Sequence, residues 1–521
     1  MTQGVLPFKY EEEKKDFCTT ASSGMLLFLD LMQKMNFPQI VNKNLRAKEG
    51  KQGWRDAQFL KALLLLNFSG GDCVNDVKQL ESDAGLRLAL KHIDLRSSFG
   101  RNREKLKRQW RKVKHNTFPS PSSIFRYLSL FHNESQEKCR TFHTAFIPEP
   151  NEHLLGLAQI NKSIMEFLQM NNPQTIATID MDATIIESNK EEALYSYKKF
   201  KGYQPLNSWW WEQNCLLYTE FRDGNVPAGF EQKRVLNKTL ECLPIGIKKV
   251  YLRSDTAAYQ HDLLTYCEKG ENERFNRIEF AIGCNVTDEF KKSVYELNNE
   301  AWHPLYQELE VEIKGKLEVK RIKTGQEWAE LSYEPNAINR SKKNPTYRYL
   351  AIREVMYEQE LPGKEMESLG QQSLPFPNIK LNNRRYKLFG VVTNMAWDGE
   401  SIIHWNRKRC GYSEQVHSEL KEAFAGGQLP SGQFGSNAAW WWIVVLAINM
   451  VSIMKNIVLN PSWKTRRMKS FRLSIIHLSG RVIKKGKELI IRLSKGHPSL
   501  DLLISARERI ASLCSYSVAG G

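Results

Sequence analysis

The chain has 521 residues, of which 41% are hydrophobic and 26% are charged. This composition excludes an intrinsically disordered, collagen-like or coiled-coil protein. At roughly 150 residues per domain, the length allows about three domains.

The net charge is +17, and two stretches hold almost all of the excess. Residues 101–114 include eight basic residues and one acidic residue, and residues 455–495 include twelve basic residues and one acidic residue. Localised positive charge indicates a polyanionic partner, most often nucleic acid. A solubilising surface or a membrane-surface helix is the alternative interpretation.

The nine cysteines form no CxxC pair, which argues against a disulfide framework or a zinc ribbon and favours a reducing compartment such as the cytoplasm. Residues 1–14 lack the apolar segment of a signal peptide. The longest apolar run, 438–448, ends at Asn449 and is short for a membrane span. We therefore expect a buried helix there and no membrane partner.

Residues 1–165 are expected to be mostly helical, with helical apolar spacing at 25–35 and 56–68. Residues 119–131 begin with turn residues, and Ser122 or Ser123 is the expected N-cap. This helix follows a basic stretch, so it is either a DNA-recognition helix or an ordinary core helix.

The pattern changes at Thr175–Asp182, where strict alternation predicts a strand. Two more strands are expected on either side of the turn residues 223–225. Helices and strands then alternate as far as residue 297. The resulting order, βββαβαβα, predicts an α/β fold with an RNase H-like catalytic core.

A polar segment rich in strand-like pieces interrupts this alternation, and a strand resumes it at 386–394. A helix over 400–424 and a buried Trp-rich helix from Asn437 are expected next. The predicted regions are a helical, DNA-binding N-terminal region (1–165), the first part of the core (166–299), a β-rich insertion (300–385), the second part of the core (386–454) and a basic C-terminal tail (455–521).

Acidic residues end two strands that an RNase H-like sheet places side by side. Asp182 ends the first strand, Asp255 ends the fourth, and Glu414 lies on the helix after the resumed strand. Three convergent carboxylates suit two Mg²⁺ ions. Taken singly, an Asp at a strand end is usually a helix cap or turn residue, and Asp182 and Asp255 are each open to that interpretation. Asp180 shares the face of Asp182 and is a second candidate ligand.

The helix around Glu414 places polar residues on one face at intervals of three or four. These are Arg407, Cys410, Glu414, His417 and Lys421. This face either meets the acidic site and a DNA phosphate, or is a solvated charged surface.

Several segments resemble, in order, the IS1380-family DDE transposases of bacterial insertion sequences. TIDMDATIIESNKEEALYSYKKFKGYQPL (178–206) resembles the first catalytic block, YLRSDTAAYQ (251–260) the second, and residues 391–450 the third. PSPSSIFRYLSLFH and GGDCVNDVKQLESD, nearer the N-terminus, are also similar to that family.

The resemblance implies a cytoplasmic bacterial transposase with Asp182, Asp255 and Glu414 as the catalytic acids. It also implies two Mg²⁺ ions, which Mn²⁺ can replace, double-stranded DNA as partner, and a homodimer or larger assembly on paired ends. The expected DNA contacts are Arg407, Arg409, Lys421, Lys201, Tyr203 and Arg253. The Tyr and Arg of the related IS4 signature are Arg407 and Cys410 here, so only its Glu and Lys are matched.

Such an enzyme binds terminal inverted repeats, cleaves the element ends and joins the 3′-OH to target DNA. Two other interpretations stay open: an RNase H-like nuclease that never joins strands, and an inactive transposase-derived DNA-binding protein. The triplets Trp209–Trp211 and Trp440–Trp442 are expected in the core, with base stacking as the alternative.

Overall fold

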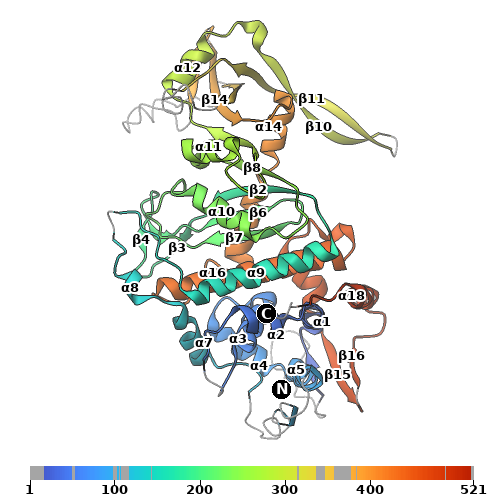
Figure 1. Ribbon diagram of the computed structural model, residues 1–521. Helices are drawn as coiled ribbons and strands as arrows, with labels where there is room; N and C mark the ends of the chain where they lie inside the picture. The colour runs from blue at the N-terminus through green and yellow to red at the C-terminus, as the bar shows by residue number, and fades with distance from the viewer. Residues whose placement is uncertain are drawn as a thin grey trace, which may run out of the picture.

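The computed structural model describes residues 17–49, 53–97, 103–104, 106, 116–141, 144–313, 316–335, 346–356, 377–382, 384–486 and 488–517. The molecule is elongated (Figure 1). Helices from the N-terminal region and two C-terminal strands form one end, a mixed sheet forms the middle, and the sheet continues into the other end.

The central sheet has ten described strands in the order β10-β11-β12-β14-β9-β8-β2-β6-β7, with β13 paired to β14. β2 is parallel to β8 and β8 is parallel to β9, whereas β2–β6 and β6–β7 are antiparallel. The inner strands are β2 (Ile176–Ala183), β6 (Leu206–Trp210), β7 (Cys215–Glu220), β8 (Lys249–Ser254) and β9 (Glu279–Cys284).

Helices follow β7, β8 and β9 as the sequence predicted: α10 (Gln232–Cys242), α11 (His261–Lys269) and α12 (Asp288–Tyr295). The turn expected at 223–225 is present, since the Val226 N–H donates to the Asp223 carbonyl at 3.1 Å, but it does not join two strands as expected. β6 and β7 are joined at residues 211–214, where Asn214 adopts a left-handed conformation (φ 53°). Asp223 instead accepts two hydrogen bonds from Arg140, both of 2.7 Å. A small sheet of β3 (Ile186–Glu187), β5 (Lys201–Tyr203) and β4 (Leu194–Tyr195) lies between β2 and β6 in the chain.

The β-rich segment continues the central sheet instead of forming a sheet of its own. Its strands are β10 (His303–Ile313), β11 (Lys316–Leu331), β12 (Arg348–Val355), β13 (Asn378–Leu381) and β14 (Arg384–Thr393). The end of β14 pairs with β9, which returns the chain to the core. The β10–β11 hairpin extends away from the rest of the molecule (Figure 1).

Two long helices pack against each other below the sheet: α9 (Glu152–Asn171) and α16 (Phe434–Ile453). Every residue of α16 is buried, which confirms the predicted Trp-rich core helix. Its extension to Val458 is long and apolar enough to cross a membrane, but 94% of that window is buried inside the protein. Asn449 follows the apolar run because it bonds to Asn161 of α9 and to both backbone groups of Leu216 in β7.

The N-terminal region is helical, as predicted. Its helices are α1 (Leu26–Lys34), α2 (Phe37–Asn44), α3 (Asp56–Ser69), α4 (Val77–Ser82), α5 (Ala84–Ser97), α7 (Pro121–Leu128) and α8 (Glu134–Glu137). The N-cap of α7 is Ser120, not Ser122 or Ser123, because Ser120 Oγ accepts the Ser123 N–H. α7 buries Ile124, Tyr127 and Leu128, so it is a core helix along that face. Most of the basic stretch 101–114 lies outside the described residues.

The basic C-terminal segment is folded onto the N-terminal helices. α17 (Met468–Phe471) is followed by β15 (Gly480–Lys485) and β16 (Glu488–Arg492), and β15 pairs with β1 (Thr19–Thr20) near the other end of the chain. α18 (Leu500–Ser512) packs on α1. Over residues 455–486 and 488–517, the expected tail is therefore part of the folded body.

Candidate active site

The carboxyl ends of β2 and β8 bring two of the predicted acids to the same edge of the sheet. The strands are parallel, and Asp180 is in register with Arg253 and Met181 with Ser254. Asp182 and Asp255 follow directly after. Burial raises the pKa of Asp255, and the negative charge of Asp182 raises this pKa further. The two carboxylates are therefore electrostatic neighbours.

The helix expected over 400–424 is broken, and Glu414, the third acid, follows the break. The segment forms α14 (Gly399–Arg407), a turn, α15 (Tyr412–Ser418) and a π-helical turn (Glu419–Ala423). Gly411, at φ 72°, begins α15 and allows this change of direction. Glu414 is exposed in the first turn of α15, and its charge raises the pKa of Asp182.

The helix break also corrects the single polar face predicted for this segment. Arg407, before the break, donates a 2.7 Å hydrogen bond to Gln326 of β11. His417, after the break, lies 4.0 Å from an Asp182 carboxylate oxygen. Cys410 is exposed. Arg407 and His417 therefore meet different parts of the protein.

Arg409 is the arginine or lysine closest to Asp182 within the described part of the chain. Its Nη2 lies 3.7 Å from Asp182 Oδ2, and its side chain is 10% exposed. Burial raises the pKa of Asp182, whereas the charge of Arg409 and a hydrogen bond from Ser413 lower it. Arg409 lowers the pKa of Asp255 as well. One guanidinium thus offsets part of the charge of two carboxylates.

Asp180, the second candidate ligand, has a different partner. Its carboxylate oxygens accept hydrogen bonds of 2.6 and 2.8 Å from Arg253. The Arg253 guanidinium also lies 4.6 and 5.0 Å from the ring centres of Trp211 and Trp405. Arg253 is fully buried, so its prediction as a DNA contact was wrong. The pair is a structural ion pair beside the candidate site.

The other predicted DNA contacts are dispersed. Tyr203 is fully buried against Phe221 and Phe434, so it is a core residue and its prediction was wrong. Lys201 donates to the carbonyl of Glu191, 2.9 Å away, and Lys421 donates to the carbonyl of Ile185, 3.4 Å away. Lys201 and Lys421 are both partly exposed.

Two residues at the site were given no catalytic or binding role from the sequence. Ser413 bonds to Asp182, and His417 lies between Asp182 and Asn207, whose Nδ2 is 3.3 Å from His417 Nε2. Together with Asp180, Asp182, Asn207, Trp209 and Tyr412 they line a small recess. Their only signal in the sequence is their place on the Glu414 helix, at positions −1 and +3.

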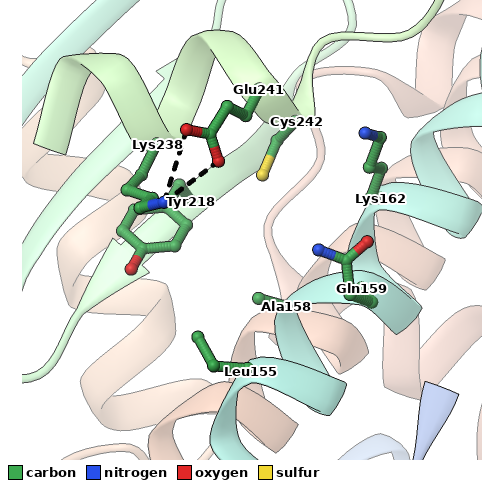
Figure 2. A pocket seen from close by; sticks show the side chains of 8 residues that line it. All are labelled: Leu155, Ala158, Gln159, Lys162, Tyr218, Lys238, Glu241 and Cys242. Atoms are coloured by element: carbon green, nitrogen blue, oxygen red, sulfur yellow. Dashed lines mark hydrogen bonds and ion pairs between the residues drawn. The ribbon is translucent and has the colours of Figure 1, made fainter. Parts of the chain in front are cut away.

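The larger cavities are elsewhere. One of about 380 Å³ lies between α9 and α10, and Figure 2 shows Lys238 and Glu241 paired at its rim, with Lys162 and Gln159 opposite. None of the three acids lines it. Five of the six Trp residues in the two triplets are fully buried or nearly so, and they pack in the core as predicted. Trp211 is half-buried against Arg253 and Tyr412.

The donor chemistry of the site suits a divalent cation. Carboxylate oxygens are the ligands that Mg²⁺ and Mn²⁺ prefer, and Asp182 is coupled electrostatically to both other acids. Within the described part of the chain, no group of three or more His, Cys, Asp or Glu side chains is close enough to hold a metal ion. The acids therefore have the right chemistry for a divalent cation, and the Arg409 guanidinium offsets part of the charge of Asp182 and Asp255.

Acids at the ends of adjacent parallel strands, with a third on a following helix, are the arrangement expected of a DDE enzyme. The sequence matches the family described as Transposase DDE domain group 1 over residues 18–348 and 376–515. The chain belongs to this transposase family.

No curated protein sequence matches the chain. Among solved structures, it is similar to a piggyBac transposase synaptic complex with hairpin DNA, determined by cryo-EM. The identity is 11% and the TM-score is 0.39, with 95% of this chain and 86% of that chain covered. No residue role is transferred from a similarity this low.

Proposed function

We propose that the protein is an active DNA transposase. It binds the terminal inverted repeats of its element, cleaves the ends, and joins each freed 3′-OH to target DNA. Asp182, Asp255 and Glu414 are its catalytic acids. The observation that carries this proposal is the coupling of Asp182 to both other acids at one edge of the sheet, within a chain of the DDE transposase family.

The core belongs, in this proposal, to the RNase H-like class. The strand order β7-β6-β2-β8-β9 supports the assignment, as do the parallel pairs β2–β8 and β8–β9. Residues 166–299 and 386–454 are the two parts of this core, and 300–385 is the insertion. The resemblance of the three motif blocks supports the finer assignment to the bacterial IS1380 transposases and a cytoplasmic location.

The acids would hold two Mg²⁺ ions, which Mn²⁺ can replace. When bound, such ions activate the attacking oxygen and stabilise the leaving oxygen. In the first reaction, a water oxygen bonds to phosphorus and the P–O3′ bond breaks, which frees a 3′-OH at the element end. In the second, that 3′ oxygen bonds to a target phosphorus as the target's P–O3′ bond breaks. No covalent protein intermediate is formed.

DNA contacts are assigned to basic groups on the side of the acids. Lys421, which follows the Glu414 helix, and Lys201, the first residue of β5, are partly exposed and can reach a phosphate by rotation of a flexible side chain. Arg407, which precedes Glu414, is a further DNA contact in this proposal. Arg409 is buried beside Asp182 and is assigned no DNA contact. A homodimer or larger assembly on paired ends is proposed from the family resemblance.

The test is strand transfer in vitro. Purified protein, Mg²⁺, a labelled duplex ending in the element's inverted repeat and a supercoiled target plasmid should give joined product. Asp182→Asn, Asp255→Asn and Glu414→Gln should each abolish cleavage while DNA binding is kept. The matched control is Glu422→Gln, which removes a carboxylate two turns further along the same segment.

Each alternative has its own outcome. Cut DNA without joined product would favour a nuclease. Binding without cleavage in Mg²⁺ or Mn²⁺ would favour an inactive DNA-binding protein. Loss of binding in all three acid variants would indicate a folding defect and would contradict the assignment of these acids to chemistry alone.

A further inference from the structure

A buried arginine lies beside the acids without a hydrogen-bonded partner for its guanidinium nitrogen Nε. The Nε–H of Arg409 is buried and donates to no acceptor within the described part of the chain. Its Nη2 is 3.7 Å from Asp182, beyond a normal hydrogen bond. The nearby Arg253–Asp180 pair, at 2.6 and 2.8 Å, shows what a fully bonded arginine looks like in the same sheet.

The backbone explains why Arg409 is held there. Its N–H donates to the carbonyl of Asn406 and its carbonyl accepts the N–H of Ser413, so it belongs to the turn between α14 and α15. Gly411 allows this turn at φ 72°. The sharp change of direction places the Arg409 side chain toward Asp182, whereas Arg407, two residues earlier, bonds to Gln326 in the insertion.

The negative charges around Arg409 indicate its role. Asp182, Asp255 and Glu414 are mutually repulsive: Glu414 acts on Asp182, and Asp182 acts on Asp255. Lys421 contributes a second positive charge near His417, but its ammonium is bonded to the carbonyl of Ile185. Arg409 is therefore the cation that offsets the charge of both aspartates.

We propose that Arg409 is a positioning residue that acts as the counter-ion of Asp182 and Asp255 before a metal binds, and that it competes with the first divalent cation for them. This inference rests on the proposed function, in which these acids hold the cation. Such a role requires a weak contact, and the 3.7 Å separation between Arg409 Nη2 and Asp182 Oδ2 is one. The guanidinium reduces the repulsion between the carboxylates without a direct hydrogen bond. A cation of higher charge can therefore displace it.

The experiment is a calorimetric titration of Mn²⁺ into the full-length protein without DNA. Removal of the competing charge in Arg409→Gln should lower the Kd for Mn²⁺ by about tenfold, the effect of one nearby charge in a partly buried site. Arg409→Lys keeps the charge and should retain the wild-type Kd. Lys408→Gln removes the same charge from the adjacent, exposed position and should also leave the Kd unchanged. Circular dichroism confirms that each variant is folded.

The outcomes separate this inference from the proposed function. Unchanged or weaker Mn²⁺ binding by folded Arg409→Gln, with normal binding by the wild type, overturns the competition and leaves the proposed acids in place. An equal gain in affinity in Lys408→Gln also overturns it, because the loss of any positive charge would then strengthen Mn²⁺ binding. Absence of Mn²⁺ binding in all four proteins overturns both proposals.

Discussion

Arg253 and Asp180 face each other across the parallel strands β8 and β2 and form two hydrogen bonds within the sheet. Asp180 lies two residues before Asp182 and so on the same face of β2, since side chains alternate along a strand. The pair also bonds to the turn of α14 through the carbonyl of Trp405. The register of the two acid-bearing strands is thus locked by a charge pair, and the third acid's segment is joined to it.

Removal of one partner of this pair should be costly. Arg253→Met leaves Asp180 buried and uncompensated, so we expect a loss of about 3–5 kcal/mol in the free energy of unfolding. The double variant Asp180→Leu/Arg253→Met should lose less than the sum of the single changes. Urea unfolding measures this difference.

The control is an ion pair of the same type on the surface. Arg507 bonds to Asp30 at 2.7 Å, but its side chain is 69% exposed. Arg507→Met should change the free energy of unfolding by about 0–1 kcal/mol. Equal losses at Arg253 and Arg507 would contradict the structural role of the buried pair.

Asn449 should be more than a polar interruption of an apolar helix. Asn449→Leu leaves the Leu216 N–H and Asn161 Oδ1 without partners in the core, so we expect a loss of about 2–4 kcal/mol in urea unfolding. The adjacent change Met450→Leu conserves volume and should cost less than about 1.5 kcal/mol. An unchanged free energy of unfolding in Asn449→Leu would show that the hydrogen bonds of Asn449 make no net contribution to stability.

Much of the fold could be predicted because local patterns determine it. Strict alternation marks β2, and helical spacing marks the N-terminal helices. Asp-Gly-Asn at 223–225 is a strong local turn signal and does form a turn, but that turn does not join two strands. The turn between β6 and β7 begins with Trp211 and Glu212, which give no turn signal, so its place was missed. The path of the C-terminal segment depends on pairing of β15 with β1, more than 450 residues away, and no local pattern records that.

The acids could be predicted from strand ends, but their partners could not. Asp180 and Asp182 are both aspartates on the same face of β2. Only Arg253 in the neighbouring strand distinguishes them, because it is in register with Asp180 and forms an ion pair with it. Tyr203 looked like part of a basic, aromatic DNA loop, yet its ring fills the core beside Phe221. Arg409 reaches Asp182 because the helix breaks at Gly411, which a regular helical wheel does not include.

His417 should give the stability of the metal-free protein a measurable pH dependence. Burial lowers the pKa of His417 to about 4, and the charges of Lys421 and Arg409 lower it too. The Asp182 oxygen, at 4.0 Å, is too far for a hydrogen bond and does not reverse this. The unfolded chain therefore binds the extra proton below about pH 6.5, and stability falls as the pH drops from there toward 4.

The measurement is urea unfolding in EDTA at pH 7 and pH 5. The wild type should lose up to about 2 kcal/mol from this residue across that interval, since 1.36 kcal/mol accompanies each pH unit between the two pKa values. His417→Gln should lose correspondingly less. His404→Gln, on the exposed side of α14, is the control and should behave as the wild type does. Parallel pH curves for His417→Gln and the wild type would contradict the assignment.

The basic β15–β16 hairpin should contribute to DNA affinity through phosphate contacts, and it can be tested without truncation. Removal of residues 455–521 would delete the core residues Met468, Phe471 and Ile475, so substitution of exposed lysines is the cleaner change. Lys484→Gln/Lys485→Gln should reduce the slope of log K against log salt concentration by up to about 2, because each lost phosphate contact removes roughly 0.9. Fluorescence anisotropy with a terminal-repeat duplex at several salt concentrations measures the slope.

Lys238→Gln/Lys269→Gln removes the same charge from α10 and α11 and should leave the slope unchanged. Equal reductions in both double variants would show that net charge, and not this hairpin, sets the affinity.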